Sequence, residues 1–540
     1  MKMKKVLSLA LALVFAIGVL AGCGGGKIVT KADVDAFKES DEKLEISWLG
    51  YGLPGCQEGT ASEKLLESEF NIELKPIFVE SSQYQKTKSS RLASGDIPDM
   101  IYELDPAHVY KDVEDKMLFE VPYEVIKQYA PSLYAEINSK AKAVWSYSYY
   151  DGANYGLPNV NHAHMVTKTA GYRQDWLEEI GKEVPTTVDE LHDVLKAFVD
   201  NKLGGSVTYG YTPADGHFQH YFGEIFGAYG VLPFDWQEVN GEIVYGGLRP
   251  EVETVLGILK SWYSEGIIYP AFAEANAEKT ALKLLQADQM GYVSNFVYEN
   301  ASAETSSIKT IQKIDPNAKL VYASQVVGPN GDRGMRGWGY PCHIVSFGAV
   351  DAETTPVKIV RLLQMFEKLF TDKDLLMKVR YGEEGKTYEV NYDGTGATAY
   401  IGIGDFADST KRRLAGYDFN TSGQSYWTPF APDDEFYKSN FTTAYSEHLD
   451  KFQDNDAVLT DVFYKVDIVP SATTYIESLR NEQIKLMNNI IMGQSDVAPD
   501  QFCEEFEKIW NANGGEEMLK EAKEQQKVNE EIFKKIDAVK

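Results

Sequence analysis

Cysteine is scarce in this chain of 540 residues. Only four cysteines occur, and Cys56, Cys342 and Cys503 follow Cys23 at wide intervals without C-x-x-C spacing. At most one disulfide can form among the last three, even in an oxidising compartment. Packing must therefore supply most of the stability.

Long apolar runs and excess basic charge are also missing. Beyond the N-terminal region no segment reaches the roughly 18 uninterrupted apolar residues of a membrane span, so we expect a soluble body. Lysine and arginine total 53 against 81 aspartates and glutamates, which gives a net charge of −28. Such a surface repels nucleic acid and anionic lipid, and no nucleic-acid partner is expected.

Sequence signatures of catalysis are absent. The chain has no G-x-S-x-G elbow, no H-E-x-x-H helix, no phosphate-binding P-loop and no dinucleotide fingerprint. A glycoside hydrolase would need two carboxylates at a defined separation, but a sequence pair carries no information among 81 acidic residues. We therefore expect a non-catalytic protein without a cofactor, and keep an exported glycoside hydrolase as an alternative.

The N-terminus is built like an export signal. Three lysines lie within the first five residues, residues 6–20 are apolar, and small residues follow. Leu20-Ala21-Gly22-Cys23 resembles the bacterial lipobox, in which the cysteine receives lipid and becomes the first mature residue. The resemblance implies a signal peptide over 1–22, lipid on Cys23 and a location on the outer face of the cytoplasmic membrane. A cleaved signal with a chance cysteine is the alternative.

Hydrophobic periodicity after the polar spacer 23–42 alternates between strand and helix. Residues 44–48 and 72–79 read as strands around a helix at 62–70, a βαβ opening. Thr187 and Glu190 form a capping-box pattern that predicts a helix over 188–199. This alternation indicates an α/β fold.

Helical spacing also occurs at 252–259 and 359–366. Near the C-terminus, residues 476–492 and a stretch beginning at Phe502 read as helices, and an exposed charged helix follows from Glu516. Residues 387–432 are rich in Gly, Asp and Tyr with little periodicity, so they are predicted to be loop-rich.

The order of several short phrases resembles the extracellular solute-binding proteins of sugar ABC importers, in the large lipoprotein branch common in Gram-positive bacteria. These phrases are SGDIPDM at 94–100, YGLP at 155–158, YRQDWL at 172–177, WYSEG at 262–266, QMG at 289–291 and YGEEG at 381–385. Together they span the region from about residue 44 to about residue 530.

This resemblance implies a type II periplasmic-binding-protein-like fold, with two discontinuous α/β lobes around a ligand cleft and hinge segments between them. The first lobe would comprise 43–158 and 329–378, and the second 159–328 and 379–540 with the C-terminal helices. The implied function is capture of an oligosaccharide by a monomer that delivers it to the permease subunits of an ABC importer. A peptide-binding or sensor lipoprotein on the same fold is a further alternative.

One position departs from the family. Many relatives carry a calcium loop after the helix that matches 188–199, whereas Asp200-Asn201-Lys202-Leu203-Gly204-Gly205 lacks the oxygen ligands such a loop needs. His162 and His164 alternate on a predicted strand, but no third ligand is near in sequence. We therefore expect no metal site.

Sugars present apolar faces and hydroxyl groups, so their sites combine aromatic rings with polar groups. Trp338 and Trp427 lie among small or polar residues, and Trp236 follows a polar turn. The other candidates come from their position in the family pattern or beside the hinge. The predicted ligand contacts are Trp338, Trp427, Trp236, Tyr51, Glu103, Tyr155, Asn295, Phe296 and His162.

Overall fold

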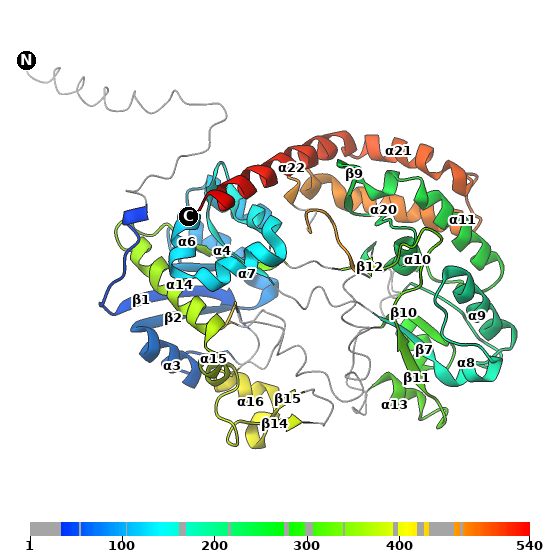
Figure 1. Cartoon of the computed structure of the whole chain (residues 1–540), viewed down its shortest axis with the longest axis horizontal. Coiled ribbons are helices and arrows are strands. Elements are labelled where there is room, and N and C mark those ends of the chain that lie inside the picture. The colour runs from blue at the N-terminus through cyan, green and yellow to red at the C-terminus, as the bar shows by residue number, and fades with distance from the viewer. Residues whose placement is uncertain are drawn as a thin grey trace, which may run out of the picture.

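The computed structural model describes the chain in separate ranges. These are residues 34–52, 56–103, 105–160, 169–213, 218–274, 280–296, 306–337, 341–392, 398–417, 426–430, 458–464 and 468–539. No helix within these ranges has the length and apolar character needed to cross a membrane. Two groups of elements, each built on its own sheet, lie on opposite sides of the molecule (Figure 1).

The first lobe is built on a five-stranded sheet in the order β2-β1-β3-β13-β6. β1 is parallel to β2 and β3, whereas β13 is antiparallel to its neighbours β3 and β6. The strands are β1 (Leu44–Tyr51), β2 (Ile72–Val79), β3 (Met100–Glu103), β6 (Gly156–Val160) and β13 (Pro341–Phe347). The predicted strands at 44–48 and 72–79 are confirmed.

Some helices of the first lobe begin at recognisable capping residues. Thr60 and Glu63 form a capping box at α3, and Asp105 caps α5 immediately after β3. The helices are α3 (Ala61–Phe70), α4 (Tyr84–Ala93), α5 (Pro106–Glu114), α6 (Tyr123–Tyr129), α7 (Pro131–Ala141), α14 (Thr355–Thr371), α15 (Lys373–Arg380) and α16 (Ser409–Leu414). Two hairpins accompany them, β4 (Tyr149–Tyr150) with β5 (Ala153–Asn154) and β14 (Tyr388–Tyr392) with β15 (Thr398–Gly402).

The second lobe contains the antiparallel sheet β10-β7-β11 and a separate hairpin, β8 with β9. Its strands are β7 (Thr169–Arg173), β8 (Trp236–Val239), β9 (Glu242–Tyr245), β10 (Tyr292–Phe296) and β11 (Leu320–Ala323). Its helices are α8 (Gln174–Ile180), α9 (Val188–Asp200), α10 (Gly223–Ala228), α11 (Glu251–Ser264), α12 (Thr280–Gln286) and α13 (Ser307–Ile311). The predicted α9 is confirmed, with Thr187 accepting from the Glu190 amide.

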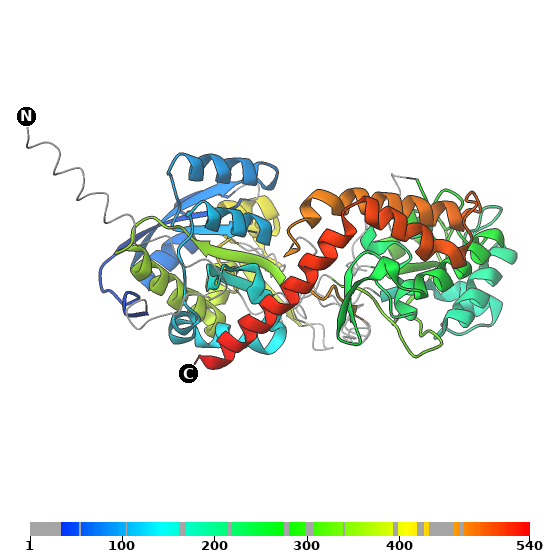
Figure 2. The ribbon, with the colours of Figure 1, turned by 90° about the horizontal axis from the view of Figure 1, so that it is seen from above.

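The C-terminal helices are α20 (Ala472–Ile491), α21 (Phe502–Ala512) and α22 (Gly515–Ala538). The first two lie against α11 in the second lobe. The red helix α22 runs from the second lobe to the first (Figure 2). It was expected to be exposed, but Met518, Ala522, Ile532 and Ile536 make one face that is buried. This helix contacts residues 142–147 of the first lobe and β9 of the second, so it packs against both lobes.

Several segments cross between the lobes. The chain leaves the first sheet after Val160, and returns to it at β13 by way of β12 (Met335–Arg336), which pairs with β16 (Val458–Leu459). The lobe boundary predicted at residue 379 differs from the structure. Ser62 donates its hydroxyl hydrogen bond to the carbonyls of Val379 and Gly416 in a bifurcated arrangement, both at 2.7 Å, so these later residues pack on the first lobe.

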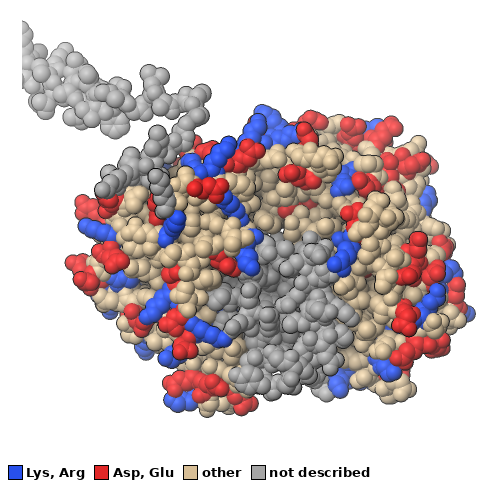
Figure 3. Space-filling model, viewed as in Figure 1, with Lys and Arg blue, Asp and Glu red and all other residues tan. Residues whose placement is uncertain are grey.

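Acidic and basic side chains are interspersed over the face of both lobes shown in Figure 3. This mixture is the ordinary means by which an acidic protein surface stays soluble.

Candidate ligand-binding site

The carboxyl edge of the five-stranded sheet brings two of the predicted residues together. Tyr51 ends β1 and Glu103 ends β3, and the parallel register of Leu49 with Ile101 places them side by side. β13 enters at the same edge, since Ile344 pairs with Glu103. Open α/β sheets bind ligands outside this edge, so it is the candidate site of the first lobe.

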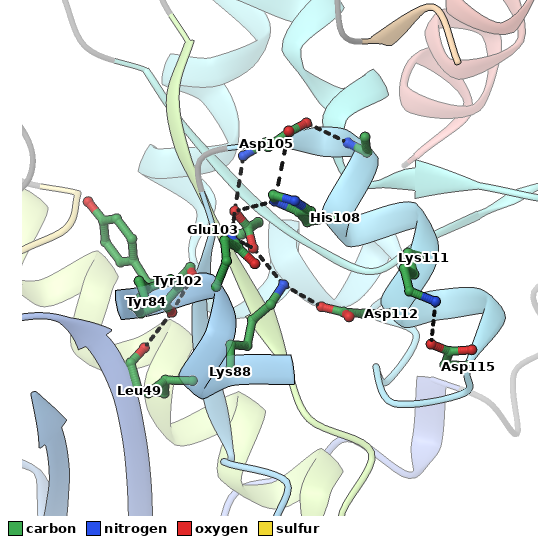
Figure 4. A network of polar contacts seen from close by, with 12 residues as sticks. Leu49, Tyr84, Lys88, Tyr102, Glu103, Asp105, His108, Lys111, Asp112 and Asp115 are labelled. Carbon is green, nitrogen blue, oxygen red and sulfur yellow. Dashed lines mark hydrogen bonds and ion pairs between the residues drawn. The ribbon is translucent and has the colours of Figure 1, made fainter. Parts of the chain in front are cut away.

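Glu103 lies at the centre of a buried polar network (Figure 4). Only 2% of its side chain is exposed, and its Oε2 is 2.6 Å from Lys88 Nζ, which also lies 2.7 Å from Asp112 Oδ2. Gln85 donates to both carboxylate oxygens at 2.7 and 2.8 Å. Burial alone would raise the pKa of Glu103, but hydrogen bonds from His108, Lys88 and Gln85 hold the pKa at about 2. The carboxylate is therefore ionised, and both of its oxygens accept hydrogen bonds from protein side chains.

His108 is the more accessible member of this network. Its Nδ1 lies 3.3 Å from Glu103 Oε1, and 40% of its side chain is exposed. An ionised carboxylate can only accept, so Nδ1 carries the proton. The hydrogen bond to Glu103 raises the pKa of His108. Glu103 thus orients the His108 ring, and sequence reasoning missed this residue because the only local signal was its place in the first turn of the helix capped by Asp105.

A group of packed aromatic rings adjoins this network. The Tyr51 ring lies 4.0 Å from that of Tyr84 and 5.5 Å from that of Tyr102, measured between ring centroids. Tyr102 in turn stacks on His343 at 4.1 Å. Tyr84 is buried and donates its hydroxyl hydrogen bond to the Tyr102 carbonyl, whereas Tyr51 is only partly buried. Burial, with Glu103 and Asp105 nearby, raises the pKa of Tyr51, so its hydroxyl is neutral at pH 7.

Trp427 has a different setting from the one predicted. It packs in the first lobe with 5% of its surface exposed, against Trp48 at 5.8 Å, Phe78 at 6.1 Å and Tyr426 at 4.9 Å. Tyr426 fixes this segment, since its hydroxyl donates to the Trp48 carbonyl and accepts from the Ile77 amide. Trp427 therefore fills the core beside β1 and β2.

Trp236 is also enclosed. It begins β8 and is completely buried, with Tyr245 at 5.5 Å and Trp510 at 6.0 Å between ring centroids. Its amide donates to Asp461 Oδ2 at 2.7 Å, which ties the second lobe to the segment after β16.

Tyr155 lies between β5 and β6, and its amide donates to the Ser148 carbonyl at 2.7 Å.

The remaining predicted contacts are only partly placed. Asn295 and Phe296 lie at the end of β10, where Phe296 pairs with Thr169 at the edge from which the crossing segment enters β7. Trp338, His162 and Cys23 lie outside the described residues. Within the described ranges no three His, Cys, Asp or Glu side chains gather as a metal site would require.

A buried charge cluster joins the crossing segments to the second lobe. Arg336 of β12 donates to Asp235 at 2.7 Å, and Arg480 of α20 lies 3.5 Å from the same carboxylate. Asp461 is completely buried nearby, and burial followed by repulsion from Asp235 raises its pKa to about 7. Tyr147 of the first lobe donates to the Phe463 carbonyl at 2.9 Å. The charge cluster fixes both crossing segments to the second lobe, and the Tyr147 hydrogen bond ties one of them to the first lobe as well.

The sequence of this chain matches a protein-family model. Residues 61–341, slightly more than half of the chain, match the model described as bacterial extracellular solute-binding protein. The matched region runs from α3 through both sheets to the start of β13.

Two curated proteins of Bacillus subtilis (strain 168) are similar over nearly the whole chain. The polygalacturonan/rhamnogalacturonan-binding protein YtcQ is 24% identical over 528 residues, covering 96% of this chain and 97% of YtcQ. Lipoprotein LipO is 21% identical over 537 residues, covering 95% of this chain and 96% of LipO.

Solved structures share the fold. The crystal structure of an extracellular solute-binding protein from Bifidobacterium longum subsp. infantis superimposes with a TM-score of 0.64 at 15% identity, covering 92% of this chain and all of that one. The predicted fold class, a type II periplasmic-binding-protein-like α/β fold, is confirmed.

Proposed function

Because this chain belongs to the family of bacterial extracellular solute-binding proteins, we propose that it is the substrate-binding protein of an ABC importer and captures an oligosaccharide between its lobes. It is a binding protein rather than an enzyme, as are the other members of the family. The observation that carries the proposal is the full-length similarity to YtcQ, which is named for binding polygalacturonan and rhamnogalacturonan.

The first-lobe edge has the chemistry that a saccharide needs. Tyr51 supplies a partly exposed ring with a neutral hydroxyl, and His108 supplies a ring held in place by Glu103. Aromatic rings stack on the apolar faces of sugars, and fixed polar groups read the hydroxyls. The second-lobe contacts proposed are Asn295 and Phe296. Tyr155, Trp338 and His162 are kept as further proposed contacts. The ligand contacts predicted for Trp427 and Trp236 stay predictions, although both side chains are buried.

Ligand binding would be coupled to lobe closure. A saccharide that bridges Tyr51 and the end of β10 would favour the closed state over the open one. The closed form would then be recognised by the permease subunits, and one monomer would serve each transporter.

A thermal-shift screen tests this function. The chain from Gly24 onward would be mixed with neutral oligosaccharides, oligomers of uronic acids and short peptides, and the products analysed. A ligand at 100 times its Kd should add about 2.7 kcal/mol of stability. A saturable shift with intact saccharide supports the proposal. Cleaved saccharide would favour a hydrolase, and a shift with peptides alone would favour a peptide receptor.

We also propose that the protein is anchored outside the cytoplasmic membrane by lipid on Cys23. The support is the lipobox-like Leu20-Ala21-Gly22-Cys23 and the similarity to LipO, which is named as a lipoprotein. Cys23→Ala should release the protein from the membrane fraction into the medium. Membrane retention of that variant would contradict the anchor.

A further inference from the structure

The segment that precedes β1 is packed on the first lobe. It belongs to the polar stretch 23–42 that separates the lipobox-like sequence from the folded body, yet Phe37 within it is only 6% exposed. The Phe37 ring meets that of Phe119 edge-on at 6.1 Å between centroids, and Val34 packs on the same core. Residues near a chain end become ordered only where interactions offset the loss of chain entropy. These apolar contacts are therefore part of an attachment.

Two helices of the first lobe bond to the same segment. Tyr129 of α6 donates its hydroxyl hydrogen bond to the Phe37 carbonyl at 3.1 Å. Gln364 of α14 donates to Glu39 Oε1 at 3.0 Å. Backbone and side chain of the segment are both used, so its position along the surface is fixed as well as its burial.

The end of α3 supplies a third point of attachment through Arg361 of α14. One nitrogen of Arg361 donates to the Phe70 and Asn71 carbonyls at 2.5 and 3.0 Å, and the other donates to the Ser40 carbonyl. Asn71 in turn donates to the Asp41 carbonyl at 2.9 Å. The guanidinium group thus joins the segment to the exposed carbonyls at the end of a helix.

The attachment is on the outer side of the first lobe. In both ribbon views the segment, drawn in dark blue, lies on the side of that lobe turned away from the second lobe (Figures 1 and 2). Its donors belong to α6, α14 and the end of α3, all of the first lobe. It therefore joins the N-terminal chain to one lobe alone.

The packed segment also shortens the chain between Cys23 and the folded body. A fully extended chain spans at most about 3.6 Å per residue, so residues 23–42 would reach about 70 Å, whereas residues 23–33 reach no more than about 40 Å. A body of about 500 residues has a radius of gyration of about 23 Å and is about 60 Å across. The shorter tether does not reach round such a body, so the point of attachment decides which lobe lies nearer to the lipid.

We propose that residues 34–41 form a clasp that holds the first lobe at the lipid surface and leaves the second lobe connected to the membrane only through the first. This inference rests on the lipid anchor proposed for Cys23. One end of the N-terminal chain is then fixed by lipid and the other by α6, α14 and the end of α3. The second lobe is left to move when the lobes close.

Hydrogen exchange tests the clasp without lipid. In the chain from Gly24 onward, the amides of residues 36–42 should exchange about tenfold faster in Phe37→Ala than in the unaltered protein, because the buried ring is lost. Phe406→Ala is the matched control. It removes a partly buried ring of the first lobe that packs on Tyr417, and it should leave this exchange unchanged.

A milder variant makes the same test without emptying an apolar position. Tyr129→Phe keeps the ring and removes only the hydroxyl that bonds the Phe37 carbonyl. It should speed exchange of residues 36–42 about fivefold, the usual effect of losing one hydrogen bond. Unchanged exchange in both Phe37→Ala and Tyr129→Phe would overturn the clasp.

Energy transfer tests which lobe is held at the lipid. Lipid-modified protein would be bound to phosphatidylcholine vesicles that contain an acceptor dye, with a donor dye on Val350→Cys of the first lobe or Ile314→Cys of the second and with serine at the cysteines other than Cys23. These side chains are 49% and 57% exposed. We expect greater transfer from position 350, and equal or smaller transfer from that position would overturn the proposal. Protein that does not bind the vesicles would instead contradict the anchor, and the exchange result would still decide the clasp.

Discussion

Tyr149 of the β4–β5 hairpin donates its hydroxyl hydrogen bond to Glu531 of α22, at 2.8 Å. The same end of the helix forms an ion pair between Lys142 and Asp537. At its other end, Glu521 accepts from the Ser471 amide at 2.7 Å. A single helix is therefore bonded to the first lobe and to the segment that opens α20.

The bond between Tyr149 and Glu531 should contribute measurably to stability. We expect Tyr149→Phe and Glu531→Gln each to lower the free energy of unfolding by about 1 kcal/mol, because each weakens a partly buried hydrogen bond. The double variant should lose less than the sum of the two single losses, as shown by urea unfolding. Lys520→Ala, which alters an exposed pair with Glu524 on the same helix, is the control. Additive losses would show that the two side chains do not interact.

Glu103→Gln should destabilise the first lobe strongly. The variant leaves Lys88 buried with only Asp112 as its partner, and breaking a buried ion pair costs about 3–5 kcal/mol. Denaturant unfolding measures the loss. Glu73→Gln, whose exposed carboxylate pairs with Lys75, is the control and should leave stability nearly unchanged, because solvent screens an exposed pair.

Glu103 also predicts a response to acid. Its pKa is lowered from 4.5 to about 2 on folding, so its contribution is complete above pH 4.5 and disappears as the pH falls through 2. Relative to Glu103→Gln, the unaltered protein should lose stability over that interval. Parallel stability curves for the two proteins would show that Glu103 does not titrate as described.

The buried carboxyl group of Glu224 in α10 predicts the opposite dependence of stability on pH. Its pKa is raised from 4.5 to about 8, so its folded-state advantage is complete below pH 4.5 and is lost as the pH rises through 8. Glu224→Gln cannot ionise and should lose less stability over this range than the unaltered protein. Urea unfolding at a series of pH values makes the comparison, and an equal slope in both proteins would mean that Glu224 is already ionised.

The aromatic candidates should separate into ligand contacts and core residues. We expect Tyr51→Ala to weaken saccharide binding more than tenfold by calorimetry, which corresponds to about 1.4 kcal/mol. Tyr129→Ala removes a partly buried tyrosine of α6, whose hydroxyl donates to the Phe37 carbonyl, and should leave the affinity unchanged. Equal affinity for Tyr51→Ala and the unaltered protein would remove Tyr51 from the site.

Trp427→Ala should instead lower stability by about 3–5 kcal/mol, since it empties a core position beside β1. A loss of affinity without a loss of stability would support Trp427 as a ligand contact.

Local sequence patterns predicted the elements well where the deciding interactions are local. The strand at 72–79 and the helix begun by Thr187 depend on alternation and on a cap three residues away. The region 387–432 was expected to be loop-rich, yet it contains β14, β15 and α16, because strand pairing between Tyr388 and Gly402 does not require strong periodicity.

The candidate site was harder to predict, because burial is decided by distant partners. Trp427 lies in a polar stretch of sequence, but the residues that bury it are Trp48 and Phe78. Lys88, Glu103 and His108 are ordinary polar or charged residues in a chain with many. They come from α4, β3 and α5, and only the packing of these three elements brings them together. Tyr51 and Glu103 were placed at one edge because parallel strand order alone determines it.

The insertion of β13 between β3 and β6 has a kinetic consequence. Ile344 pairs with Glu103 about 240 positions earlier in the chain, and the second-lobe sheet lies in sequence between them. While the chain is being synthesised and exported, one edge of β3 has no partner strand until the whole intervening stretch has emerged. Such long-range closure is slow and leaves strands available for mispairing. We therefore expect folding of the first lobe to be the rate-limiting step in maturation of the protein. A chaperone that covers the unpaired edge of β3 should increase the yield of folded protein.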